Sequence, residues 1–128
     1  MKYIFSFIFL AILIACTSDN EQEYFPQIDC TTDNLYYHTS DDARSISSII
    51  SNKCVSCHNQ GNMANVQYII LETYAQLSDL DNIVEVINRP ADHQNPMPPV
   101  GSTQLTDCEK LQIENWITNG SLYDENNR

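Results

Sequence analysis

A pair of cysteines followed at once by a histidine, in the stretch CVSCH at residues 54–58, constrains this chain more than any other feature of its sequence. Cys54 and Cys57 are three residues apart, so on a helical turn their side chains are neighbours. Three chemistries use thiols at this spacing: a redox-active pair, a zinc site and the covalent attachment of haem. The last two would also give a chain with few large apolar side chains something to fold around.

The surroundings of CVSCH favour haem over its rivals. A thioredoxin-like redox pair would lie in a βαβ pattern, and no such pattern is visible. A zinc site needs four ligands, and Cys54, Cys57 and His58 supply three unless Cys30 or Cys108 is recruited. A simple disulfide within the motif would leave the adjacent histidine without a role. Cys-x-x-Cys-His is the attachment sequence of haem c, in which both thiols bind the porphyrin and the imidazole ligates the iron.

A helix is predicted to lead into the motif. It begins near Thr39, which has Asp42 three residues later in the pattern of a capping box. Ile46, Ile49 and Ile50 follow at the spacing of one helix face. The helix therefore presents an apolar stripe to the interior and carries the first cysteine at its end.

Two more helices are predicted further along the chain. A short one covers residues 78–88 and ends before Pro90. The last begins at Thr106, which forms a capping box with Glu109, and ends at Gly120, which suits the left-handed position past a helix. Their apolar faces comprise Leu80, Ile83, Val84 and Ile87 in the first, and Ile113, Trp116 and Ile117 in the second.

The loops between these helices are long for so small a domain. One runs from about residue 59 to 67, and the proline-rich stretch RPADHQNPMPPVG covers residues 89–101. The stretch VQYIILETY, residues 66–74, is too short for its pattern to decide between strand and helix. Because the helix faces supply only about a dozen large apolar side chains, we expect an all-α domain built around a large apolar group.

With these elements in view, residues 41–122 resemble the single-haem class I cytochromes c. The resemblance consists of the helix into CVSCH, the closing helix TDCEKLQIENWITNG and the proline and methionine loop between them. More narrowly, the chain is similar to the lipoprotein-borne cytochrome c domains of bacteria. The resemblance implies a small domain, residues 39–123, of about three to four helices around one covalently bound haem c. It also implies that Cys54 and Cys57 form the thioethers and that His58 is the proximal iron ligand.

The second axial ligand is expected on the proline-rich loop. The stretch Asn95-Pro96-Met97-Pro98-Pro99 resembles the Pro-Met-Pro-Pro ligand loop of short bacterial members, which makes Met97 the distal ligand. The flanking prolines restrict the unfolded chain and so lower the cost of holding the sulfur. His93, four residues upstream, is the rival ligand. The family often places a proline carbonyl against the proximal histidine, but no proline lies between His58 and Pro90, so that partner is open.

The chain begins with an export signal. Residues 1–15 contain an apolar run that is too short to span a membrane and suits a signal-peptide core. The sequence Leu13-Ile14-Ala15-Cys16 resembles the bacterial lipobox, which implies acylation of Cys16; an ordinary signal peptide is the alternative. Residues 16–38 are read as a lipid-anchored polar tether and residues 124–128 as a polar tail. We therefore expect a place in the bacterial cell envelope, on the periplasmic or outer-membrane and surface side.

The remaining cysteines and the net charge restrict the partners. In an exported protein Cys30 and Cys108 can form a disulfide, and two free thiols are the alternative. A net charge of −11 excludes electrostatic binding to nucleic acid or to an anionic lipid surface, so the membrane would be reached through the lipid anchor only. An acidic surface could steer redox partner proteins that have a basic docking surface, although solubility alone also explains the charge.

The function predicted from these residues is that of a single-electron carrier with a His/Met-ligated haem in an envelope redox chain. With both axial positions filled, the chain would not be an enzyme. Two alternatives stay open. One is a haem enzyme or ligand sensor whose sixth iron position is vacant or labile. The other is a surface lipoprotein without haem, stapled by disulfides or zinc.

Overall fold

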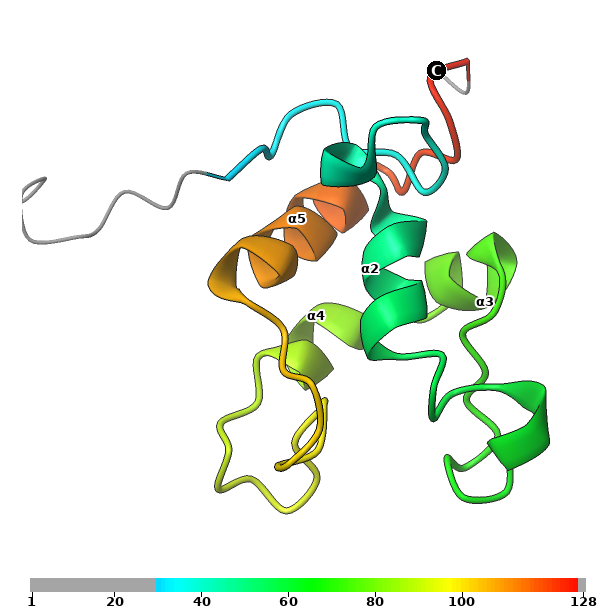
Figure 1. Cartoon of the computed structure of the whole chain (residues 1–128), viewed down its shortest axis with the longest axis vertical. Helices are drawn as coiled ribbons and strands as arrows, with labels where there is room; N and C mark the ends of the chain where they lie inside the picture. The colour runs from blue at the N-terminus through cyan, green and yellow to red at the C-terminus, as the bar shows by residue number, and fades with distance from the viewer. Residues whose placement is uncertain (1–29, 127–128) are drawn as a thin grey trace, which may run out of the picture.

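The structure is a computed structural model that describes residues 30–126, and Figure 1 shows their arrangement. Extended segments of these residues meet only at an isolated parallel bridge between Tyr36 and Ser45. The regular elements are η3 (Asp42–Arg44), α2 (Ile46–Lys53), η4 (Gln60–Asn62), α3 (Tyr74–Ser78), α4 (Ile83–Ile87) and α5 (Asp107–Thr118). The all-α class is thus confirmed for the described part of the chain, whereas the haem-binding cytochrome fold remains a prediction.

The start of the first helix differs from the prediction. The expected capping box of Thr39 and Asp42 was wrong: α2 begins at Ile46, and the N-cap is Ser45, whose hydroxyl accepts the Ser48 N–H at 3.4 Å. Ser45 is extended because it pairs with the preceding chain, and the Ile46 N–H donates to the Tyr36 carbonyl at 2.9 Å. This tertiary pairing separates α2 from the short turn η3.

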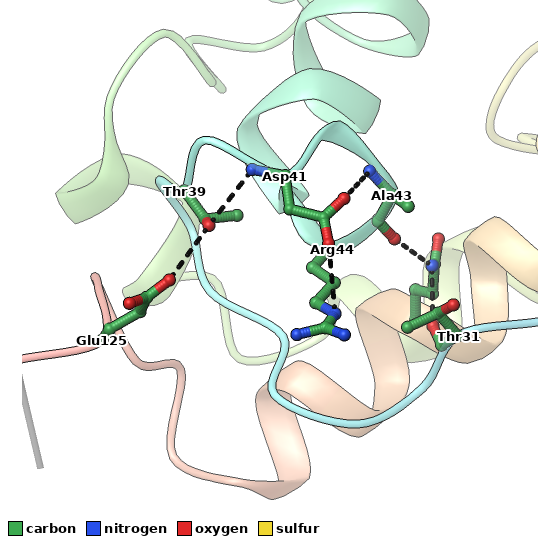
Figure 2. A network of polar contacts seen from close by, with 7 residues as sticks. Thr31, Thr39, Asp41, Ala43, Arg44 and Glu125 are labelled. Carbon is green, nitrogen blue, oxygen red and sulfur yellow. Dashed lines mark hydrogen bonds and ion pairs between the residues drawn. The ribbon is translucent and has the colours of Figure 1, made fainter.

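The residues of the expected capping box have other partners, as Figure 2 shows. Asp41 caps η3 by accepting the Ala43 N–H at 3.1 Å and forms an ion pair with Arg44 at 3.3 Å. The Thr39 hydroxyl accepts the Asp41 N–H at 3.4 Å and donates to Glu125 at 3.5 Å. Thr39 therefore joins the two ends of the described chain instead of starting a helix.

The last helix forms as its sequence predicts. The Thr106 hydroxyl accepts the Glu109 N–H at 3.1 Å, and the Glu109 carboxylate accepts the Thr106 N–H at 2.7 Å, so the capping box is confirmed. Gly120 follows the helix with a φ of 91°, the left-handed conformation that glycine adopts most easily. Ile113 and Trp116 on this helix are fully buried.

The middle helices are short. The helix predicted over residues 78–88 is reduced to α4, Ile83–Ile87, with Ile83 and Ile87 buried. The undecided stretch at residues 66–74 leads into α3, whose N-cap Thr73 forms a capping box with Gln76. Helix α5 packs against both α2 and α4. The core comprises Leu35, Ile46, Ile49, Ile50, Leu71, Leu77, Ile83, Ile87, Leu105, Ile113 and Trp116.

The segment before η3 is attached to this core. Cys30 forms a disulfide with Cys108 in the first turn of α5. The buried amide of Gln112 donates to the Thr31 and Ala43 carbonyls, at 2.8 Å each. Leu35 is buried as well, so the packed part of the chain begins before residue 39.

Both long loops lie at one end of the molecule. Figure 1 shows the loop after α4 and the loop after α2 on either side of the end of α2, opposite the ends of the described chain. Within residues 30–126 no helix is long and apolar enough to cross a membrane.

Candidate functional site

The CVSCH motif forms a tight turn directly after α2. The Cys54 and Val55 N–H groups both donate to the Ile50 carbonyl, at 2.9 and 3.1 Å. The Cys57 and His58 N–H groups then donate to the Cys54 carbonyl, at 3.1 and 2.9 Å. The backbone of the motif is therefore fixed by hydrogen bonds, and all three functional side chains leave from a single turn.

Two asparagines that the sequence analysis did not single out hold this turn. The Asn59 amide donates to the Val55 carbonyl at 2.9 Å and to the Ser56 carbonyl at 3.1 Å. The Asn62 amide donates to the Cys57 carbonyl at 2.9 Å. These carbonyls lie past the helix end and lack helical partners, so the side-chain amides replace the missing donors. The cluster of asparagines in HNQGN was the available sequence signal.

The two thiols of the motif are free. Cys54 is half-buried and Cys57 is exposed, and no disulfide joins them. Burial raises the pKa of the Cys54 thiol to about 11, and the negative charge of Glu109 acts in the same direction. Cys54 therefore stays protonated at neutral pH. Both thiols are in the state that thioether formation requires, since a disulfide would have consumed them.

The imidazole of His58 has one nitrogen fixed and one free. Its Nδ1 lies 2.9 Å from the backbone carbonyl oxygen of Ile69. Because a carbonyl can only accept, Nδ1 carries the proton and Nε2 of the neutral ring carries the lone pair. Nε2 has no hydrogen-bond partner among the described residues. Metal-ligating histidines commonly have this arrangement, in which the second ring nitrogen donates to a carbonyl.

The backbone before Ile69 is strained. Gln67 and Tyr68 have φ values of 53° and 65°, a left-handed conformation that side chains disfavour by about 1–2 kcal/mol per residue. The turn is closed by the Tyr68 N–H, which donates to the Met63 carbonyl at 2.8 Å, and by the Leu71 N–H, which donates to the His58 carbonyl at 2.9 Å. The chain thus turns back on itself and brings the Ile69 carbonyl to the imidazole.

The two candidate distal ligands differ in their surroundings. Met97 is half-buried on the proline-rich loop and its sulfur has no polar partner among the described residues. His93 is exposed, and its Nδ1 accepts the Asn95 N–H at 3.0 Å. The proton of the neutral His93 ring is therefore on Nε2 in this conformation, and His93 would have to break this hydrogen bond or change tautomer to ligate a metal. This hydrogen bond disfavours His93 relative to Met97.

The donor set fits a haem better than a metal held by the protein alone. Within residues 30–126 no three His, Cys, Asp or Glu side chains come together as a metal site. Cys30 and Cys108 are bonded to each other, so neither is available as the fourth ligand of a zinc ion. A haem iron takes only its axial ligands from the chain, and an imidazole such as that of His58 can be one of them.

Several large apolar side chains are exposed on the loops after α2 and α4. Tyr68 is 73% exposed, Val100 is 72% exposed and Ile69 is 38% exposed, all on the two loops that flank the end of α2. A shallow hollow of about 300 Å³ is lined by Tyr68, Ile69, Ile70, Gln76 and Leu80. A second hollow of about 350 Å³ is lined by residues that include Cys108, Glu109 and Gln112 but none of the CVSCH residues, and we assign it no part in the site.

The lipidation candidate Cys16 and the signal peptide lie outside the described residues. No family model, no curated protein and no solved structure matches this chain. Function therefore has to be inferred from the residues of the site themselves.

Proposed function

We propose that this chain is a monohaem c-type cytochrome that carries single electrons in the bacterial cell envelope. The observation that carries the proposal is the CVSCH turn, which combines two free thiols with a His58 ring whose Nδ1 is held by the Ile69 carbonyl. When bound, the haem supplies a one-electron redox couple at its iron.

The residues of the motif would attach and orient the cofactor. Cys54 and Cys57 would hold it through thioether bonds, so that it could not be lost outside the cytoplasm. His58 would ligate the iron through Nε2, and the Ile69 carbonyl would fix its tautomer and increase its basicity. Met97 would supply a thioether on the other side, and His/Met ligation raises the reduction potential. With both positions taken, no site is left for a substrate at the iron.

The disulfide supports the expected location. Disulfides such as Cys30–Cys108 are typical of proteins that fold in an oxidising compartment. Export directed by residues 1–15 would bring the chain to such a compartment. Acylation of Cys16 would then attach the domain to a membrane while its redox partner proteins approach from the aqueous side. The 17 acidic and 6 basic residues of the chain would favour a partner with a basic docking surface.

The test is to express the full chain with a cytochrome c maturation system and look for haem that survives denaturing electrophoresis. We expect covalent haem in the unmodified chain and none in the Cys54→Ala, Cys57→Ala double variant. Oxidised spectra should show low-spin haem with the far-red sulfur-to-iron band, lost in Met97→Ala and kept in His93→Ala.

The outcomes separate the proposal from its alternatives. Absence of covalent haem in the unmodified chain would favour the haem-free surface lipoprotein. High-spin ferric haem that binds cyanide directly would favour the enzyme or sensor. A low-spin spectrum without the sulfur-to-iron band, unchanged in Met97→Ala and converted to high-spin in His93→Ala, would assign the distal position to His93.

A further inference from the structure

We infer that Lys53 and Gln104 form a clamp that fixes the Met97 thioether relative to the CVSCH turn. The Lys53 ammonium donates to the Gln104 backbone carbonyl at 2.9 Å, and the Gln104 side-chain amide donates to the Pro99 carbonyl at 2.9 Å. Lys53 directly precedes Cys54, and Pro99 is two residues past Met97. The inference rests on the proposed function, because Met97 needs a fixed position only if it ligates an iron.

The Lys53 side chain is held more firmly than a surface lysine normally is. It is only 14% exposed, and its ammonium also lies 3.4 Å from the Glu109 carboxylate. The same carboxylate oxygen accepts the Thr106 N–H at 2.7 Å in the capping box of α5. One cation therefore joins the end of α2, the end of the proline-rich loop and the start of α5.

The Gln104 side chain adds hydrogen-bond donors to the carbonyls of the proline-rich loop. Pro98 and Pro99 have no N–H, so the Pro99 carbonyl takes its backbone donor from the Ser102 N–H, at 3.0 Å. The Gln104 amide lies 2.9 Å from the Pro99 carbonyl, 3.1 Å from the Ser102 carbonyl and 3.5 Å from the Pro98 carbonyl. The Ser102 hydroxyl adds a further hydrogen bond to Pro99 at 2.7 Å. Removal of the amide would leave the Pro99 carbonyl bonded to Ser102 and break its link to Gln104.

The clamp is anchored to the core at one side only. Leu105, next to Gln104, is buried, whereas the Gln104 side chain itself belongs to an exposed residue. Loss of that side chain would therefore loosen the loop and leave the core intact. A purely structural role would give the opposite result: a lower unfolding temperature with an unchanged bond between Met97 and the iron.

The experiment compares matured, haem-loaded full-length variants. Lys53→Met and Gln104→Ala each break one link of the clamp. Lys110→Met removes a cation that has no side-chain partner among the described residues, and Gln94→Ala removes an exposed amide from the same loop that also has none. Free imidazole is titrated against the ferric protein, where it competes with Met97, and thermal unfolding and the far-red band are recorded in parallel.

We expect imidazole to bind about fivefold more tightly to Lys53→Met and Gln104→Ala, since each loses a hydrogen bond that holds the ligand loop. The controls should stay within about twofold of the unmodified protein. Equal imidazole affinity in all five proteins, with the sulfur-to-iron band present, would overturn the clamp and leave the proposed function standing. Absence of covalent haem, or of Met97 ligation in the unmodified protein, would overturn both. If Lys53→Met fails to mature, Gln104→Ala decides the result.

Discussion

The His58 imidazole donates through Nδ1 to the backbone carbonyl of Ile69, 2.9 Å away. No proline lies between His58 and Pro90, so the acceptor is not the proline carbonyl expected from the resemblance. The interaction needs no particular side chain at position 69. It needs only the backbone path through Gln67 and Tyr68, whose left-handed conformations turn the chain toward the imidazole. The orientation of the ring is therefore a property of the apoprotein that can be measured without haem.

We predict that His58 and His93 hold opposite tautomers in the haem-free protein. His58 should carry its proton on Nδ1, because it donates to Ile69, and His93 on Nε2, because it accepts from Asn95. Nitrogen-15 shifts of the imidazole rings, recorded above the ordinary titration range of histidine, distinguish the two forms. His38, whose ring has no hydrogen bond among the described residues, should give averaged shifts and serves as the reference. Averaged shifts at His58 would contradict the Ile69 contact.

The Cys54 thiol should remain unreactive until strongly alkaline pH. Its pKa is raised from 9.0 to about 11 by burial and by Glu109, so the unfolded chain loses this proton first as the pH rises. Folding stability should accordingly fall between about pH 9 and pH 11. Peptide mapping after brief alkylation should give a midpoint near 11 for Cys54 in the folded apoprotein and near 9 in urea. Glu109→Gln should lower the folded midpoint, and a folded midpoint of 9 would refute the desolvation argument.

The disulfide should be a main source of stability. Replacing Cys30 and Cys108 with serine releases a loop of 78 residues and should lower the free energy of unfolding by about 3–4 kcal/mol. Urea unfolding measures the loss. Cys57→Ser, at an exposed and unbonded cysteine, should change it by less than about 0.5 kcal/mol. If dithiothreitol leaves the unfolding midpoint of the unmodified apoprotein unchanged, the bond contributes nothing.

The buried amide of Gln112 should contribute more to the stability of the fold than a glutamine on a helix usually does. Gln112→Leu removes the donor of two hydrogen bonds and leaves the Thr31 and Ala43 carbonyls, both drawn in Figure 2, without it. We expect a loss of about 2–3 kcal/mol in the free energy of unfolding. Gln94→Leu, at an exposed residue, is the matched control. Equal unfolding midpoints for the two variants would show that water replaces the lost donor.

Local signals in the sequence predicted those parts of the fold that depend on neighbouring residues. The capping box of Thr106 and Glu109 and the position of Gly120 are set within a few residues, so the bounds of α5 followed from spacing alone. The start of α2 did not, because Tyr36 pairs with Ser45 across the chain and holds that residue extended. The local capping pattern at Thr39 does not start a helix, because this tertiary contact sets where α2 begins.

The candidate site divides in the same way. The thiols and the imidazole of CVSCH could be named from the sequence because their chemistry belongs to their side chains. The hydrogen-bond partner of His58 could not be predicted, because every residue has a backbone carbonyl. The left-handed turn at Gln67 and Tyr68 also contains no glycine that would indicate it in the sequence. The hydrogen bonds of the Lys53 and Gln104 side chains could not be predicted either, because their acceptors are backbone oxygen atoms.

The bond between Cys30 and Cys108 also determines how this domain would bear mechanical load. A pull on the chain before Cys30 passes through a covalent bond to the first turn of α5 and bypasses residues 31–107. The hydrogen bonds of Tyr36, Tyr37 and His38 with the rest of the domain are therefore shielded from that force. A domain attached to a membrane through its N-terminus would therefore receive the force at α5, while the two loops around CVSCH would bear none of it.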